Sequence, residues 1–182
     1  MTERSPEPKA DNADGEGVAR MLRVDQAGEL GAVRIYQGQM AVLGRTASGP
    51  LIEKMAAQER HHLETFNRLV GERQVRPTVL SPLWHVAGFA LGAATALLGE
   101  RAAMACTVAV EETIDAHYAG QAERLGETEA PLRDTIETFR AEEVEHRDIA
   151  LAHDAERAAG YPVLSSAIKA GCRVAIWLSE RI

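Results

Sequence analysis

The chain of 182 residues is long enough for one domain with a single sizeable core. Its composition, 46% hydrophobic and 26% charged, is that of an ordinary globular protein and excludes wholesale disorder and a polytopic membrane protein. With 20 basic and 27 acidic residues the net charge is −7, which argues against nucleic acid as a partner because binding it needs a basic face. Two cysteines without paired spacing exclude a disulfide scaffold and a cysteine zinc site.

Residues 1–16 contain two prolines and five acidic residues, and after Met1 they have no large apolar side chain. They match neither a secretory signal, which needs an apolar stretch, nor a transit peptide, which is rich in arginine and poor in acids. We therefore expect a disordered tail over 1–16 and a single folded domain over 17–182.

The later prolines divide the chain into stretches rich in strong helix formers. In chain order, the sequence predicts helices over 17–45, 50–71, 82–99, 101–126, 130–158 and 162–180. Turn-forming sequences at 44–50, 125–131 and 158–162 agree with these boundaries, and no alternating run of residues predicts a strand. The predicted fold class is therefore all-α.

Two Glu-x-x-His patterns are the candidates for chemistry: Glu59 with His62, and Glu143 with His146. Residues three apart on a helix share a face, so the two members of each pair can bind the same centre. One such pattern is a weak signal, because chance alone supplies similar pairs in a chain rich in glutamate. The arrangement of the rest of the chain around the two patterns makes the signal stronger.

A single glutamate precedes each pattern, and the interval from Glu29 to Glu59 nearly equals the interval from Glu111 to Glu143. A turn near the middle of each interval would fold each half into an antiparallel helical hairpin and bring these residues to the same depth. The offset between the two single glutamates is also nearly the same as the offset between the two Glu-x-x-His patterns. These matched intervals indicate an internal duplication.

Four carboxylates and two imidazoles in one core need cations, because buried like charges repel one another and lose their hydration. Two divalent metals would neutralise the four carboxylates, with carboxylates bridging and one histidine capping each metal. Mixed oxygen and nitrogen ligands with open positions favour iron or manganese over zinc or copper. Spacing alone does not choose between Glu111 and Glu112, or between Glu143 and Glu142, which could instead pair with His146 on the same helix.

Five stretches resemble the demethoxyubiquinone hydroxylase family of ubiquinone biosynthesis: RVDQAGELGAVRIYQGQMAVLGRT, PLIEKMAAQERHHLETFN, RPTVLSPLWHVAGFALGAATALLG, ACTVAVEETIDAHY and FRAEEVEHRDIALAHDAE. The resemblance extends from about Arg20 to the C-terminal GCRVAIWLSERI. It implies a ferritin-like four-helix bundle of two duplicated hairpins, with an apolar crossover helix and a C-terminal helix beside it. It also implies two iron ions, with ligands at Glu29, Glu59, His62, Glu111, Glu143 and His146. The family pattern thereby favours Glu111 over Glu112, and Glu143 over Glu142.

The same resemblance implies an activity, hydroxylation of the ring of a polyprenyl demethoxyubiquinol by O₂, with reducing equivalents ultimately from NADH. The family uses a His-Tyr pair after its third glutamate ligand, and His117 and Tyr118 stand there in this sequence. The pair would position the substrate or reductant, or relay electrons or protons; the alternative is a pair on a helix face without chemistry. We also expect carboxylates bonded to His62 and His146 to orient these ligands.

The apolar segment 77–99 has no charged residue between Arg76 and Glu100. A helix over 82–99 would be about 27 Å long, which is marginal for a membrane crossing. A crossing would also separate the two hairpins and their six ligands. We therefore expect an interfacial or re-entrant helix that docks on the membrane, with a crossover helix packed on the bundle or an oligomer contact as the alternatives.

Because a polyprenyl quinol lies in the bilayer, we expect a peripheral enzyme on the cytoplasmic face of a bacterial plasma membrane, or on the mitochondrial inner membrane in a eukaryotic member. A homo-oligomer or other ubiquinone-biosynthesis proteins are possible partners, and the helix over 162–180 would flank the entry of the substrate. Two other functions stay open. One is a ferritin-like ferroxidase or peroxide-detoxifying iron protein with the same six ligands, and the other is a metal-free helical scaffold at the membrane.

Overall fold

Prolines begin four of the helices in the structure, as the sequence predicts. Pro50, Pro82, Pro131 and Pro162 each occupy the first or second position of a helix, where the missing N–H group costs no hydrogen bond. The computed structural model describes residues 15–182, and its helices are α1 (Gly15–Leu43), α2 (Gly49–Glu72), α3 (Ser81–Leu97), α4 (Glu100–Ala122), α5 (Ala130–Ala152) and α6 (Tyr161–Ser179). No strand occurs within this range, which confirms the all-α prediction.

Two of the predicted helix boundaries differ from the structure by more than three residues. The helix predicted to end at 158 ends at Ala152, because Asp154 adopts a left-handed conformation with φ of 61° and the chain then forms a short 3₁₀ helix over Ala155–Arg157. The helix predicted to end at 126 ends at Ala122. At the start of the chain, the expected tail lies outside the described residues up to position 14, whereas Gly15 and Glu16 already belong to α1.

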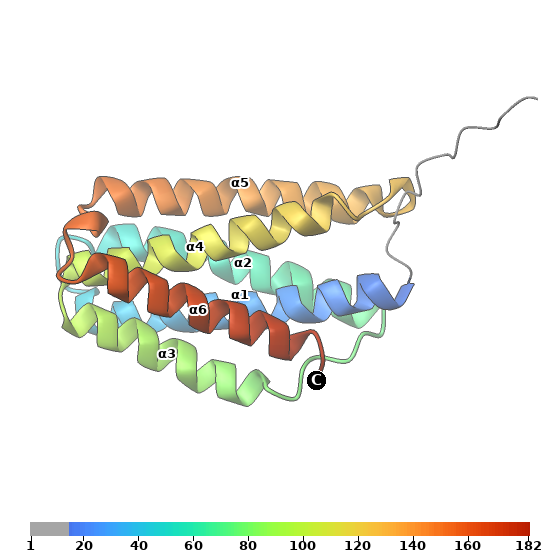
Figure 1. Cartoon of the computed structure of the whole chain (residues 1–182), viewed down its shortest axis with the longest axis horizontal. Helices are drawn as coiled ribbons and strands as arrows, with labels where there is room; N and C mark the ends of the chain where they lie inside the picture. Colours follow the sequence, from blue (N-terminus) through green and yellow to red (C-terminus); the bar gives the residue numbers. More distant parts are fainter. Residues whose placement is uncertain (1–14) are drawn as a thin grey trace, which may run out of the picture.

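Four helices form the bundle, and each half of the chain contributes one hairpin. α1 packs against α2 and α4 packs against α5, as the duplication predicts, and the two hairpins face each other (Figure 1). The remaining two helices lie outside this bundle, with α3 against α1 and α6 against α4. The ferritin-like bundle is therefore confirmed, and each half of the chain adds a third helix in the same relative place.

The outer helices extend the repeat, although they pack at different distances. The offset that relates Glu59 to Glu143 also relates Gly88 and Gly92 in α3 to Cys172 and Ile176 in α6. At the glycines, α3 approaches the backbone of α1 so closely that a Cβ atom on Gly92 would lie 1.9 Å from the carbonyl oxygen of Ile35. α6 has larger side chains at the equivalent positions and packs less closely on α4 than α3 packs on α1. The predicted crossover helix is thus fixed on α1 by backbone contact.

The exposed apolar side chains gather on the side formed by α3 and α6. Nine large apolar residues are exposed among residues 15–182, and all lie on these helices or directly beside them: Val79, Leu83, Val86, Leu97, Leu98, Val163, Val174, Trp177 and Ile182. We call this set the apolar face. The start of α3 and the end of α6 are joined by a hydrogen bond of 3.0 Å from Trp84 Nε1 to Ser179 Oγ. Within the described residues, no helix has both the length and the apolar character that a membrane crossing requires.

Replacing Gly92 with alanine should lower the free energy of unfolding by about 1–3 kcal/mol, because the added methyl group forces α3 away from α1. Gly171→Ala is the matched control, since the same change in α6 meets no heavy atom within 4 Å. In that exposed position alanine should stabilise the helix by up to about 1 kcal/mol. Urea unfolding followed by circular dichroism measures both effects. Equal stability of the two variants would contradict the close packing of α3 on α1.

Candidate metal centre

Six side chains from the four bundle helices converge in the middle of the bundle. α1 and α4 each supply one glutamate, and α2 and α5 each supply a glutamate and a histidine one turn apart. All six are at most 1% exposed: Glu29, Glu59, His62, Glu111, Glu143 and His146. These are the six residues that the sequence analysis selected, so the structure brings the whole predicted set together.

The six residues form two overlapping groups, each with ligand atoms within 4.8 Å of one another. One group contains Glu29, Glu59, His62 and Glu143, and the other contains Glu59, Glu111, Glu143 and His146. Glu59 and Glu143 belong to both groups. The geometry therefore suits two metal ions that share two bridging carboxylates, with one further carboxylate and one histidine for each ion.

Both imidazole rings turn the same nitrogen toward the carboxylates. His62 Nδ1 lies 3.2 Å from Glu143 Oε1, and His146 Nδ1 lies 3.0 Å from Glu59 Oε1. The other nitrogen of each ring is bonded outside the cluster, 2.7 Å from Glu142 Oε2 for His62 and 3.1 Å from Gln58 Oε1 for His146. The expected carboxylate partner is thus present for His62, but the expectation was wrong for His146, whose partner is an amide.

Two buried tyrosines hold the outer glutamates. Tyr36 on α1 donates a hydrogen bond of 2.9 Å to Glu111 on α4, and Tyr118 on α4 donates one to Glu29 on α1. Each tyrosine lies two helical turns after the glutamate of its own helix, so the two bonds cross between α1 and α4 in a symmetric way. One oxygen of each outer glutamate is thereby fixed, and the other faces the centre.

The atoms that face the centre lack hydrogen bonds. Within residues 15–182, no hydrogen-bond partner is found for one oxygen of Glu29 and of Glu111, both oxygens of Glu59 and of Glu143, and Nδ1 of both histidines. Buried polar atoms are nearly always bonded, and each exception needs a reason. Metal ions supply that reason, because carboxylate oxygens and imidazole nitrogens gathered in this way are the ligands of dimetal sites in helical bundles. The residues therefore fit a metal centre.

Burial and mutual charge shift the pKa values of these groups in the metal-free protein. Burial raises the pKa of Glu59 to about 8, and the charge of Glu143 adds to the rise. Burial opposes the charge on His146, but the adjacent carboxylates of Glu143 and Glu59 raise its pKa to about 9. For Glu143 the two histidines outweigh burial and lower its pKa to about 2. Without metals, protons therefore supply part of the positive charge that the carboxylates need.

A family model described as "Ubiquinone biosynthesis protein COQ7" matches residues 16–179 of the chain. The chain belongs to this family. It is 64% identical over 166 residues to the 3-demethoxyubiquinol 3-hydroxylase of Rhodospirillum rubrum, an alignment that covers 91% of this chain and 78% of that relative. This match confirms the resemblance noted in the sequence.

Two mitochondrial relatives extend the comparison. The chain is 58% identical over 183 residues to the NADPH-dependent 3-demethoxyubiquinone 3-hydroxylase of Homo sapiens, which covers 98% of this chain and 84% of the relative. It is 46% identical over 195 residues to the 5-demethoxyubiquinone hydroxylase of Saccharomyces cerevisiae, with 96% and 84% covered. The family match thus holds over nearly the whole described domain.

The two residues proposed from the family's His-Tyr pair occupy different places. Tyr118 touches the centre through Glu29, whereas His117 lies one position away and faces Asp25, whose Oδ1 atom is 3.4 Å from His117 Nε2. Gln121 Nε2 donates to the same Asp25 oxygen at 2.7 Å and lies 2.9 Å from the His117 ring. His117 also lines a cavity of about 440 Å³ between α4 and α6.

Sequence reasoning chose the central residues but missed several that support them. Tyr36 and Gln58 received no role, although the repeat itself points to both. Tyr36 and Tyr118 are separated by the same number of residues as Glu29 and Glu111. Gln58 and Glu142 are likewise separated by the same number as Glu59 and Glu143.

The structure also decides between the alternatives that spacing left open. Glu112 lies outside the centre in an ion pair with Lys169. Glu142 bonds to His62 of the opposite hairpin instead of to His146 on its own helix. Glu111 and Glu143 are therefore the residues that face the centre, as the family pattern implied.

The metal-free protein should become less stable as the pH rises from about 6.5 to about 8.5. Glu59 and His146 have pKa values of about 8 and about 9 in the folded protein, above their ordinary 4.5 and 6.5. The folded state therefore binds more protons than the unfolded state over this interval, and each extra proton costs about 1.4 kcal/mol per pH unit. Saturating Mn²⁺ should reverse the slope, because the metal displaces these protons and binds more tightly at higher pH.

Urea unfolding at both pH values, with and without Mn²⁺, measures this effect. The variant His146→Gln should reduce the slope of the metal-free protein, whereas His61→Gln, at an exposed histidine on α2, should leave it unchanged. A metal-free protein whose stability rises over this interval would show that the cluster does not retain extra protons.

Proposed function

We propose that the chain is a 3-demethoxyubiquinol hydroxylase, a di-iron monooxygenase that hydroxylates the ring of a polyprenyl demethoxyubiquinol with O₂ in ubiquinone biosynthesis. The observation that carries the proposal is the complete buried set of four glutamates and two histidines in a chain whose relatives carry that name. A ferritin-like iron protein would use the same set, but its function gives no reason for the apolar face beside the bundle.

Iron is the proposed metal because the residues combine carboxylate oxygens with two imidazoles, a mixture of ligands that suits iron. Two iron ions held by these residues would supply the reduction of O₂ and the transfer of one oxygen atom to the ring. The chain's own contribution is to fix the ligands. Glu59 and Glu143, which belong to both groups, would be shared by the two ions, while Tyr36 and Tyr118 hold the two outer glutamates in place.

The ring of the quinol would lie in the cavity between α4 and α6. Its lining combines apolar side chains such as Ile176 and Trp177 with Thr113 and His117 and with the charged residues Glu112, Lys169, Arg173 and Glu180, so it offers both apolar surface and polar groups to a ring that carries oxygen substituents. His117 is the lining residue nearest to Tyr118 in the chain. Its Nε2 atom lies 3.4 Å from Asp25 Oδ1 and 2.9 Å from the amide nitrogen of Gln121, and its ring would contact the quinol.

The reductant would be a nicotinamide nucleotide, and the chain would use it without a separate nucleotide-binding domain. NADH is our expectation from the family resemblance, whereas the name of the human relative specifies NADPH. Both nucleotides must therefore be offered in any assay of turnover.

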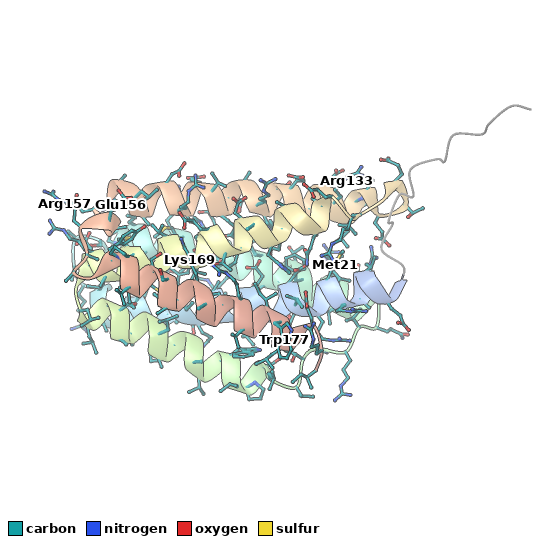
Figure 2. All side chains as sticks on the ribbon, in the orientation of Figure 1. Met21, Arg133, Glu156, Arg157, Lys169 and Trp177 are labelled. Atoms are coloured by element: carbon teal, nitrogen blue, oxygen red, sulfur yellow. The ribbon has the colours of Figure 1, made fainter. Side chains whose placement is uncertain are left out.

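The apolar face would place the enzyme on a membrane. Its nine side chains lie along the outer helices, and Figure 2 shows Trp177 near the end of α6, where Trp84 of α3 also lies. Exposed apolar patches of this kind mark contacts with lipid or with other proteins. A peripheral enzyme on the cytoplasmic face of a bacterial plasma membrane, or on the mitochondrial inner membrane, would thereby meet a substrate that stays in the bilayer.

The decisive assay uses iron-loaded protein, short-chain demethoxyubiquinol, NADH or NADPH, and ¹⁸O₂. Mass spectrometry of the quinone product should find one labelled oxygen atom on the ring. Glu29→Ala should abolish this product and release iron, because a ligand is lost. His117→Asn should retain both metals and slow the reaction by on the order of 100-fold, the range expected for a group that transfers protons.

The control is Glu64→Ala on α2, where an exposed glutamate is removed and activity should remain. Oxygen consumption with iron oxidation, but without label in a quinone that is shown to bind, would replace this proposal with a ferroxidase. Full hydroxylation by the Glu29 variant would contradict the ligand set.

Binding to lipid vesicles tests the proposed location. The double variant Leu97→Glu, Leu98→Glu should reduce co-sedimentation with vesicles at least about tenfold, since each buried leucine contributes about 1.5–3 kcal/mol. Both leucines are 74% exposed in the structure, so the change leaves the core intact. Ala57→Glu with Ala141→Glu adds the same charge to exposed positions on α2 and α5 and should leave binding unchanged. Equal binding of both variants would contradict docking through the apolar face.

A further inference from the structure

The two halves of the chain surround the centre with matching bonds. Tyr36 and Tyr118 make the same crossed bond to the outer glutamate of the opposite half. Likewise, the residue before each bridging glutamate bonds to the histidine of the opposite half: Glu142 to His62, and Gln58 to His146. Because the arrangement is repeated, any difference between the two metal positions must come from residues that differ between the halves.

The residue behind each imidazole is such a difference. With a metal on Nδ1, each ring keeps its proton on Nε2 and donates it outward. For His62 the acceptor is a carboxylate at 2.7 Å, and for His146 it is a neutral amide oxygen at 3.1 Å. A bond to a carboxylate is charge-assisted, shorter and stronger, so it moves more electron density onto the ring that receives it.

Each imidazole ring also packs against one aromatic side chain. Phe139 stacks on His62 with ring centroids 4.0 Å apart, and Tyr36 meets the edge of His146 at 6.1 Å. Both histidines are fully buried. The acceptor therefore acts on the donor strength of a fixed ligand.

We propose that the two metal positions are unequal, and that Glu142 makes the position of Glu29 and His62 the tighter one while Gln58 leaves the position of Glu111 and His146 weaker. Glu142 and Gln58 are positioning residues in this scheme, since neither touches a metal. The inference rests on the dinuclear centre of the proposed function, but not on its substrate. Removing a partner of this kind typically costs on the order of 10- to 100-fold in metal affinity.

Anaerobic calorimetric titration of the metal-free full chain with Fe²⁺ tests the proposal without turnover. The unaltered chain should bind two ions in two resolved steps. Glu142→Gln should weaken the first step by on the order of 10- to 100-fold and merge it with the second. Gln58→Glu should instead tighten the second step. The combined swap, Glu142→Gln with Gln58→Glu, keeps the net charge and should restore two steps with the order of the positions reversed.

Variants in the outer glutamates identify which position fills first. Glu29 belongs only to the His62 group and Glu111 only to the His146 group. Glu29→Gln should therefore remove the tight step from the unaltered chain, and Glu111→Gln should remove it from the swapped chain. Glu145→Gln removes an exposed carboxylate from the same helix as Glu142 and should leave both steps unchanged.

Each alternative result has a distinct meaning. If the unaltered chain binds two ions in indistinguishable steps, the proposed inequality of the two positions is wrong, but the dinuclear centre stands. The same conclusion follows if Glu142→Gln leaves both binding steps unchanged while the variant melts like the unaltered chain. Fewer than two ions bound by the unaltered chain would overturn the dinuclear centre and the inequality with it. Loss of affinity in the swapped chain equal to that in Glu142→Gln would show that Glu142 acts through packing, and would also overturn the proposal.

Discussion

Four carboxylates buried in two overlapping groups at the middle of the bundle are the constraint on which this structure depends. Charges taken out of water cost several kcal/mol each unless they are paired, and like charges at this distance repel. Two imidazoles and two tyrosine hydroxyl groups lie against these carboxylates and stabilise them, and the arrangement could hold metal ions. It also requires four long helices, because each ligand must reach the same depth from a different direction.

Apolar clusters on both sides of the centre supply the stability that the charges remove. One cluster, which includes Phe66, Ile136 and Phe139, packs toward the turn between α4 and α5, and another, which includes Ile52 and Met104, packs toward the opposite end. Each fully buried side chain of this size contributes about 1.5–3 kcal/mol. The same clusters hold the ligand rings, since Phe139 stacks on His62. Apolar packing and ligand geometry are thus set by the same residues.

The sequence predicts most of this arrangement because the relevant signals are local or repeated. Prolines locate the helix starts, and the Glu-x-x-His spacing places two ligands on one helical face. The bond from Glu142 to His62 could not be predicted in this way, because it depends on how α5 is rotated against α2. Spacing within one helix left open a pair of Glu142 with His146 instead. The end of α5 was also missed, since the left-handed conformation of Asp154 has no strong signal in the sequence. Side-chain contacts between different helices are therefore the part that the sequence does not predict, except where the internal repeat supplies an equivalent residue in the other half.

The outer helices show how two copies of one unit come to differ in access. Ile35 on α1 and His117 on α4 are related by the same offset as the two outer glutamates, so they occupy equivalent places beside the centre. On the α1 side, the backbone of α3 closes over Ile35 at Gly92. On the α4 side, Ile176 replaces that glycine, α6 stands farther away, and a cavity remains beside His117. A symmetric bundle would place the same surroundings on both sides of its centre. Here Gly92 brings the backbone of α3 onto Ile35 on one side, whereas a cavity lies on the other side, beside His117, the polar member of the pair.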